Sequence, residues 1–223
     1  MSVHEDARRR RAPASLKDVA AQEIRHRVFN GGLRPGQKID QDALADELGI
    51  SKLPVREALI SLGHEGIVEH IARRGAYVAE LSRDDIRDHY VVFGMVAGLA
   101  AERAAARLAA NDLAGLCDLA HRMEAGSPGP EQDDLNFEFH RAINLAADSR
   151  RLVSVLGSLG RLIPHGWFES HGGWAERAHR EHRAILDALV ARDGAAAREA
   201  TRRHFAGGGD VAVMRLEAHR YWD

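Results

Sequence analysis

The sequence predicts a mainly α-helical protein in which three helices and a small β-hairpin precede an all-helical bundle. Hydrophobic residues make up 45% of the 223 residues but aromatic residues only 5%, and the abundant Ala and Leu favour helices. Two short β-prone runs, 67–68 and 76–78, flank a basic turn. From residue 82 onward the apolar spacing is helical. These three observations define the expected fold class.

The first predicted helix begins after Ser15, whose hydroxyl can accept a hydrogen bond from an unpaired backbone N–H of the first turn. Apolar side chains then recur at roughly helical spacing: Val19, Ile24, Val28 and Phe29. The pair Gly31-Gly32 ends the helix.

Two further helices follow closely. Asp40 is the expected N-cap of the second helix and Gly49 its stop. Ser51 caps the third helix, and Pro54 is tolerated in its first turn because no intrahelical N–H is needed there. An inward stripe follows at positions i, i+4 and i+7: Val55, Leu59 and Leu62. With the hairpin after them, these helices have the order of a winged helix-turn-helix, which we place at residues 15–81.

The remainder, residues 82–223, is expected to form a separate domain of about six helices. It opens with Ser82 and Asp85 in the spacing of a capping box. Breaks are expected near Asn111, at 126–130, near Ser149, at 164–174 and at 193–194.

Charge and composition limit the partners. The net charge is −2, with 13 Lys and Arg against 12 Asp and Glu in residues 1–80 and 18 against 21 in the rest, so any DNA binding must come from locally placed cations. Residues 1–14 include Arg8–Arg11 and are expected to form a disordered basic arm, solvated or touching phosphate or the minor groove. No apolar run approaches the roughly 20 residues of a membrane span, and no secretory leader is visible. A cytoplasmic protein without a membrane partner is expected, and the single cysteine, Cys117, as a buried thiol.

The third helix and the hairpin carry the candidate DNA contacts. A helix-turn-helix places the start of its last helix in the major groove, where an arginine fork matches two acceptors of guanine. Two arginines on a hairpin are often only a solvated turn, but here they follow three helices in the right order. The predicted DNA-binding residues are Arg34, Ser51, Lys52, Arg56, Arg73, Arg74 and Gly75.

The stretch "LRPGQKI…LADELGISKLPVREALISLGHEGIVEHIARRGAYVAEL" resembles the winged-helix domain of the GntR family of bacterial transcription regulators. The helical remainder resembles the FCD effector domain of the FadR-like branch. The resemblance implies a homodimer that binds a palindromic operator and responds to a small carboxylate. We expect a repressor, with an activator as the alternative. The family usually has Arg where this chain has Lys52, and a lysine lacks the fork, so base choice there is expected to be looser.

A second group of residues is a candidate metal site. Asn136 and His140 are four residues apart and share one helix face. His182 and His204 are each 11 residues from Asp193, so two antiparallel helices joined there would place them level with one another. Spacing alone leaves open that these are ordinary core or surface histidines.

Resemblance to FCD domains, many of which hold a divalent metal with one Asp or Asn and three His, implies a set of four ligands: Asn136, His140, His182 and His204. The ion would be of the zinc or nickel type. An Asn carbonyl is neutral, so affinity is expected to be lower, and an anionic ligand becomes more attractive.

The same resemblance indicates an altered effector pocket. FCD domains usually carry Arg and then Glu four residues later in their first long helix, and Phe93 and Ala97 align with those positions here. That helix is apolar on nearly every side, as a buried wall would be, through Val92, Met95, Val96 and Leu99. We expect an aromatic or medium-chain carboxylate as effector; alternatively, Phe93 and Met95 fill the space and no effector binds.

Two other functional classes stay open: a metal-dependent hydrolase that uses the three histidines, and a helical protein-binding adaptor. Against the hydrolase, the segment starting at His64-Glu65 has Val68 where an HExxH motif needs histidine. No GxSxG motif or phosphate loop is present. Glu181 adjoins His182 and is therefore expected to point to a different face, which leaves no acidic base beside the histidines. We expect that the protein is not an enzyme.

Overall fold

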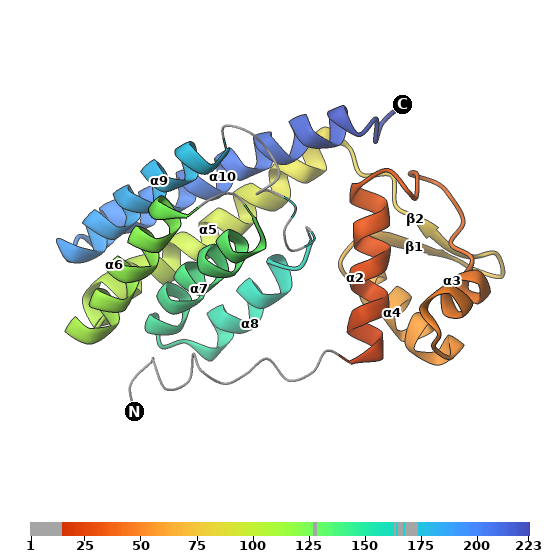
Figure 1. Ribbon diagram of the computed structural model, residues 1–223, viewed down its shortest axis with the longest axis horizontal. Coiled ribbons are helices and arrows are strands. Elements are labelled where there is room, and N and C mark those ends of the chain that lie inside the picture. The colour runs from red at the N-terminus through yellow and green to blue at the C-terminus, as the bar shows by residue number, and fades with distance from the viewer. Residues whose placement is uncertain (1–14, 127–128, 163, 165–166, 168–173) are drawn as a thin grey trace. The chain divides into compact units, whose positions relative to one another are not determined.

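The computed structural model describes residues 15–126, 129–162, 164, 167 and 174–223 (Figure 1). The chain divides into two compact units. The amino-terminal unit contains the described residues of 15–85, 161–164 and 213–223, and the bundle unit contains those of 86–160 and 165–212. The predicted basic arm, residues 1–14, lies outside the described residues, as does most of the predicted break at 164–174.

The amino-terminal unit holds three helices and two strands: α2 (Leu16–Phe29), α3 (Gln41–Leu48), α4 (Lys52–His64), β1 (Val68–Ile71) and β2 (Gly75–Val78). Ser15 and Asp18 form the reciprocal bonds of a capping box at the start of α2. The Asp40 carboxylate accepts hydrogen bonds from the backbone N–H groups of Asp42 and Ala43, 3.0 and 3.1 Å away. The predicted caps at Ser15 and Asp40 are therefore confirmed.

The two strands form an antiparallel hairpin whose register runs from Val68 opposite Val78 to Ile71 opposite Gly75. Its inner face and the inner faces of the three helices share one apolar core, whose largest fully buried members are Ile24, Phe29, Leu59, Leu62 and Ile67. Among the apolar residues that recur along α2, Val19 is 41% exposed, whereas Ile24, Val28 and Phe29 are fully buried. The pattern from Ile24 onward decides which face of α2 is buried.

A buried ion pair ties α2 to the end of α4 within this core. The Arg25 side chain is only 4% exposed, and its guanidinium donates to the carboxylate of Glu65. Burying one such charge alone is costly, so each partner is tolerated in the core only because the other is present.

Six helices lie in the described part of the chain after residue 82, as predicted: α5 (Arg83–Arg107), α6 (Ala110–Ala125), α7 (Pro130–Ala146), α8 (Arg150–Leu159), α9 (Trp174–Val190) and α10 (Gly194–Ala218). The capping box at Ser82 and Asp85 forms at the start of α5. The break expected near Asn111 instead falls at residues 108–109. Within the described residues no helix is long and apolar enough to cross a membrane.

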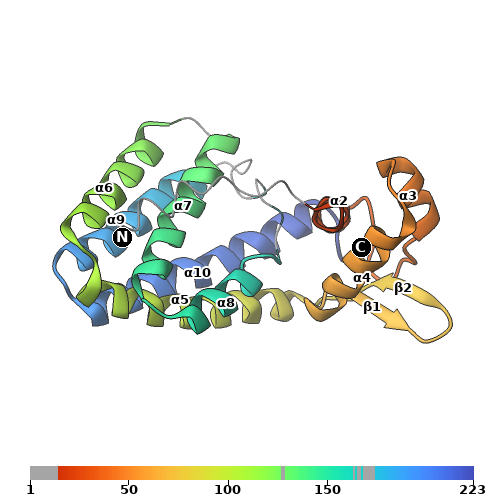
Figure 2. The same ribbon diagram turned by 90° about the horizontal axis from the view of Figure 1, so that it is seen from below.

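The bundle unit is built around the long helices α5 and α10, which lie side by side in both views (Figures 1 and 2). Glycines allow their backbones to approach closely. A Cβ atom on Gly94 would come within 2.9 Å of the Arg202 carbonyl oxygen, and one on Gly98 within 2.8 Å of the Arg198 carbonyl oxygen. The face of α5 that carries these glycines is therefore fixed against α10.

Candidate functional site

The start of α4 presents polar side chains to solvent. Ser51 occupies the N-cap position, but its hydroxyl makes no capping hydrogen bond. Arg56 is exposed one turn further on. Lys52 is also exposed, but its ammonium group lies 2.8 Å from the carboxylate of Asp42, a residue of α3. This hydrogen bond raises the pKa of Lys52. To contact a DNA phosphate, the Lys52 ammonium group must therefore break its ion pair with Asp42 or bind both partners at once.

The tip of the β-hairpin, the wing, carries the second set of cations. Arg73 and Arg74 are both exposed, and the Arg74 guanidinium lies 5.7 Å from the centre of the Tyr77 ring. Arg73 and Gly75 have φ angles of 61° and 113°, so the turn uses the left-handed region twice. Glycine relieves the strain only at the second of these positions.

Lys38 is a further candidate DNA contact that the sequence did not reveal. It forms an isolated antiparallel bridge with Tyr77, and a Cβ atom on Gly75 would lie 3.3 Å from its Cε. Its side chain is exposed beside the wing. The only sequence signal was a lysine in the short extended piece after Pro35-Gly36.

Arg34 has a partner inside the amino-terminal unit. Its guanidinium donates to the carbonyl oxygen of Asp223 at 2.9 Å. The same segment is anchored twice more, because Trp222 Nε1 donates to the Leu81 carbonyl at 2.7 Å and the Tyr221 hydroxyl donates to the Ala79 carbonyl at 3.3 Å. A contact between Arg34 and a DNA phosphate remains a prediction. The Arg34 guanidinium would then have to bind the phosphate and the Asp223 carbonyl oxygen together, or give up the latter.

Three of the four predicted metal ligands converge in the bundle unit. His140 of α7, His182 of α9 and His204 of α10 have ring nitrogens that all lie within 4.8 Å of one another. The rings of His182 and His204 are 4.6 Å apart between centres, so the two are level, as their equal distance from Asp193 indicated. Asn136 lies one turn before His140 on α7 and is partly buried.

The imidazoles of His140 and His182 favour the neutral form. Burial lowers the pKa of His140 well below 6.5, and the neighbouring His204 lowers it further. Burial also lowers the pKa of His182 well below that value, with His204 and His140 adding to the effect. A neutral imidazole is the form that binds a metal ion.

Glu181 lies beside the cluster, which corrects the expectation that it points elsewhere. Its carboxylate is 2.9 Å from His204 Nδ1 and also accepts a hydrogen bond from Arg177 at 2.8 Å. Burial alone would raise the pKa of Glu181, but these two hydrogen bonds lower it overall. Neighbouring positions on a helix are about 100° apart, so His182 and Glu181 can both reach toward α10.

The donor set fits a divalent ion of the zinc or nickel type. Because a carboxylate only accepts hydrogen bonds, Glu181 fixes the proton of His204 on Nδ1 and leaves Nε2 free as a ligand. His140 Nε2 and His182 Nε2 lie 3.2 Å apart. Two nitrogens bound to one tetrahedral zinc are about 3.3 Å apart, given Zn–N distances of about 2.0–2.1 Å.

Of the two predicted effector residues, Phe93 is linked to this cluster through one further aromatic ring. The Phe93 ring is 4.3 Å from that of Phe205, and Phe205 is 5.0 Å from the His140 ring. Ala97 is buried. The expectation that α5 is buried on nearly every side is wrong, since Val92 and Met95 are 48% and 54% exposed.

An exposed basic recognition helix with a wing, in a chain that also contains a histidine-lined helical bundle, defines a DNA-binding regulator with a candidate sensory domain. Family comparison agrees: the profile for bacterial regulatory proteins of the gntR family matches residues 16–78, and the FCD domain profile matches residues 88–207. The chain belongs to the GntR family of bacterial transcription regulators and carries an FCD domain. Members of this family are transcription regulators that bind operator DNA, and they are not enzymes. The two alternative functional classes, a metal-dependent hydrolase and a protein-binding adaptor, are therefore wrong.

Among its relatives are two named regulators. The chain is 25% identical to the HTH-type transcriptional repressor RspR of Escherichia coli K12, over 81% of this chain and 82% of that protein. It is 29% identical to the uncharacterized HTH-type transcriptional regulator Rv0043c of Mycobacterium tuberculosis, where the match covers 66% of this chain and 61% of the relative's length. Among solved structures, Escherichia coli McbR/YncC has the same fold, with a TM-score of 0.67 at 21% identity, over 90% of this chain and 98% of that one.

Proposed function

We propose that this regulator is a repressor that binds a palindromic operator as a homodimer and is controlled by a carboxylate bound in the bundle unit. The start of α4 and the wing supply the exposed cations that operator binding needs, chiefly Arg56, Arg73 and Arg74. The repressor assignment draws support from the name of the relative RspR. Two identical subunits related by a two-fold axis suit a palindromic site.

The observation that carries the sensory part of the proposal is the convergence of His140, His182 and His204 from three helices. These side chains, with Asn136 as a fourth donor, would hold a divalent ion, and Glu181 would orient His204. The ion would supply a positive charge that a carboxylate can ligate. The neutral Asn136 leaves that charge less compensated than an aspartate would.

The expected effector has a larger apolar part than a citrate-like acid. Phe93 and Phe205 place two aromatic rings in series beside His140. The resemblance to FCD domains implies that Phe93 replaces a cation. An apolar wall binds hydrocarbon well but leaves a second carboxylate without a hydrogen-bond partner. An aromatic or medium-chain monocarboxylate therefore satisfies the site best.

The test combines operator binding with a panel of acids. An operator selected from a pool of random duplexes is titrated with the zinc-loaded full chain, with and without each acid. Aromatic and medium-chain monocarboxylates should weaken operator binding and raise the Tm of the zinc-loaded protein, and Phe93→Arg should shift the preference toward polar acids. If only di- and tricarboxylates act, or if no acid acts, the effector assignment is wrong. Strengthened operator binding would contradict the assignment as a repressor.

A further inference from the structure

The first turn of α4 carries a large apolar side chain in solvent. Leu53 is 63% exposed, more than any other large hydrophobic residue in the described part of the chain. It lies between Lys52 and Pro54, at the end of the helix that a helix-turn-helix places at DNA. Single exposed apolar residues are common on protein surfaces, so the position of Leu53 has to carry the argument.

The core of the amino-terminal unit does not use Leu53. The side of α4 that packs against α2, α3 and β1 consists of four other buried residues: Val55, Ala58, Leu59 and Leu62. Leu53 shares the exposed side of the helix with Arg56, and side chains three residues apart are neighbours on a helix surface. The start of α4 therefore presents an apolar and a cationic side chain next to each other.

Helix geometry aims Leu53 at whatever the start of α4 contacts. The Cα–Cβ bonds of an α-helix tilt toward its amino terminus, and Leu53 is in the first turn. A recognition helix enters the major groove with its amino-terminal residues. On DNA, the Leu53 side chain is therefore among the first to reach the base edges.

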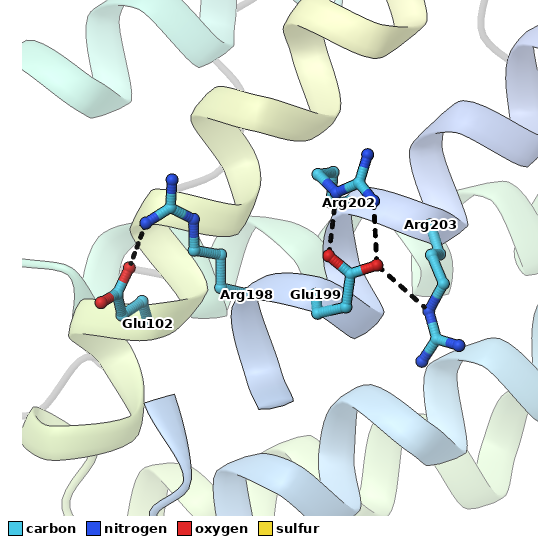
Figure 3. Close-up of polar contacts among 5 residues, drawn as sticks. All are labelled: Glu102, Arg198, Glu199, Arg202 and Arg203. Atoms are coloured by element: carbon cyan, nitrogen blue, oxygen red, sulfur yellow. Dashed lines mark hydrogen bonds and ion pairs between the residues drawn. The ribbon is translucent and has the colours of Figure 1, made fainter. Parts of the chain in front are cut away.

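The cations of this surface are not neutralised within the subunit. Arg56 of α4 and the wing residues Arg73 and Arg74 have no ion-pair partner among the described residues. The exposed arginines of α10 differ, because three of them lie 2.9–3.8 Å from a carboxylate: Arg198 beside Glu102, and Arg202 and Arg203 beside Glu199 (Figure 3). Free cations around Leu53 indicate a polyanion as its partner.

An acidic neighbour of Leu53 is compatible with a base edge. Glu57 is exposed one turn after Leu53 on the same side of α4. A carboxylate there is repelled by the anionic headgroups of a membrane. In the major groove it can accept a hydrogen bond from the amino group of cytosine.

The major groove of DNA offers an apolar group on one base. Thymine presents its C5-methyl group there, whereas the other groups that distinguish the base pairs are hydrogen-bond donors and acceptors. A leucine side chain forms no hydrogen bonds, so packing it against a donor or acceptor would leave that group desolvated and unpaired. Thymine is therefore the base whose edge Leu53 fits.

We propose that Leu53 selects thymine in the operator by packing against its C5-methyl group. This inference rests on the operator contact of α4 in the proposed function, and it adds a second base to the guanine assigned to Arg56. Three residues of a helix rise about 4.5 Å, and successive base pairs are about 3.4 Å apart. The thymine therefore lies one or two base pairs from that guanine.

The first experiment changes the DNA and leaves the protein intact. In an operator selected from random duplexes, each thymine is replaced in turn by uracil, which differs from thymine only by lacking the C5-methyl group. At the thymine bound by Leu53, this replacement should raise the Kd of the full chain about 3- to 5-fold, the value for one buried methyl group. Fluorescence anisotropy measures the Kd. If no uracil weakens binding, the proposal is overturned.

The second experiment assigns the methyl contact to Leu53. In Leu53→Ala the same uracil should leave the Kd nearly unchanged, because the shortened side chain no longer reaches the methyl group. The variant should keep the wild-type Tm, since alanine favours helix and Leu53 is outside the core. Ile60→Ala, which changes a 45% exposed side chain seven residues further along α4, is the matched control and should keep the full uracil effect. A Leu53→Ala protein that keeps it too assigns the methyl to another residue and overturns the proposal.

The proposed function and this inference fail in different ways. If neither Arg56→Ala nor Leu53→Ala changes operator affinity, α4 does not read the operator, and both are wrong. If Arg56→Ala weakens operator binding but Leu53→Ala has the same uracil effects as wild type, only the role of Leu53 is wrong.

Discussion

The predicted DNA-binding surface and the histidine cluster are both polar sites, but they are built in opposite ways. The first consists of exposed, separate cations on α4 and the wing, with Lys52 paired to Asp42 in solvent. The second consists of imidazole rings packed against one another and against Phe139 and Phe205. Exposed charges respond to salt, whereas buried imidazoles respond to protons and metal ions. The two sites should therefore be separable by mutation and by solution conditions.

The largest effect is expected from removal of one ligand of the cluster. His182→Ala takes away a buried imidazole that lies within reach of both other histidines, so the ion should be lost on dialysis. Elemental analysis should then show up to one divalent ion per chain in the wild type and none in the variant. His179→Ala, on the same helix but outside the cluster, is the control and should keep the ion. A wild type that takes up neither zinc nor nickel would end the metal assignment.

The second prediction separates base reading from phosphate binding on the DNA surface. Arg56→Ala should cost about 1–3 kcal/mol on the selected operator and much less on random duplex, because an arginine fork reads guanine. Arg74→Ala should weaken both duplexes alike and reduce the salt slope by about 0.9, the value for one phosphate. Fluorescence anisotropy at several salt concentrations measures both. Arg151→Ala on α8 is a control exposed arginine in the other unit. Unchanged operator affinity in Arg56→Ala would refute the recognition-helix assignment.

The third prediction concerns acid and the metal-free protein. The pKa values of His140 and His182 are held well below 6.5 in the folded state, so unfolded chains bind more protons once the pH falls below 6.5. The free energy of unfolding should therefore fall as the pH drops below 6.5, by up to about 1.4 kcal/mol per pH unit for each proton. Urea denaturation at several pH values, with a chelator present to keep the protein metal-free, measures this pH dependence of the unfolding free energy.

The matched variant for this measurement is His140→Gln. It removes one of the two imidazoles whose pKa is lowered in the folded state, so its unfolding free energy should depend less steeply on pH below 6.5. An equal pH dependence in wild type and variant would show that other histidines, of which the chain has 13 in all, control acid stability.

Local sequence patterns account for what was predicted well. The order of helices and hairpin follows from caps, glycines and apolar spacing, all of which act over a few residues. The level placement of His182 and His204 followed from one turn and the rise of a helix. The exposure of Val92 and Met95 could not be predicted from the sequence. Apolar spacing marks one face of a helix, but it does not say whether another helix of the same subunit covers that face.

The contacts that were missed join residues far apart in the chain. The Arg34 bond to Asp223 spans 189 positions, and the Trp222 bond to Leu81 spans 141. The Glu181 contact with His204 depends on how closely α9 packs on α10, which no spacing rule gives. In each case the side-chain chemistry was visible in the sequence, but the partner was not.

The smallest predicted effect concerns the pair between Lys52 and Asp42. Both side chains are about two-thirds exposed, so water and salt screen the pair and its contribution is small. Asp42→Asn frees Lys52 for phosphate and removes a negative charge beside the recognition helix, so operator affinity should rise roughly 2- to 5-fold at low salt, and the gain should shrink as salt screens it. In a Lys52→Ala background the same substitution should bring a smaller gain, because no lysine is then released. An Asp42→Asn protein whose gain is the same with and without Lys52 would show that only the long-range charge matters, and that the ion pair does not hold Lys52 away from DNA.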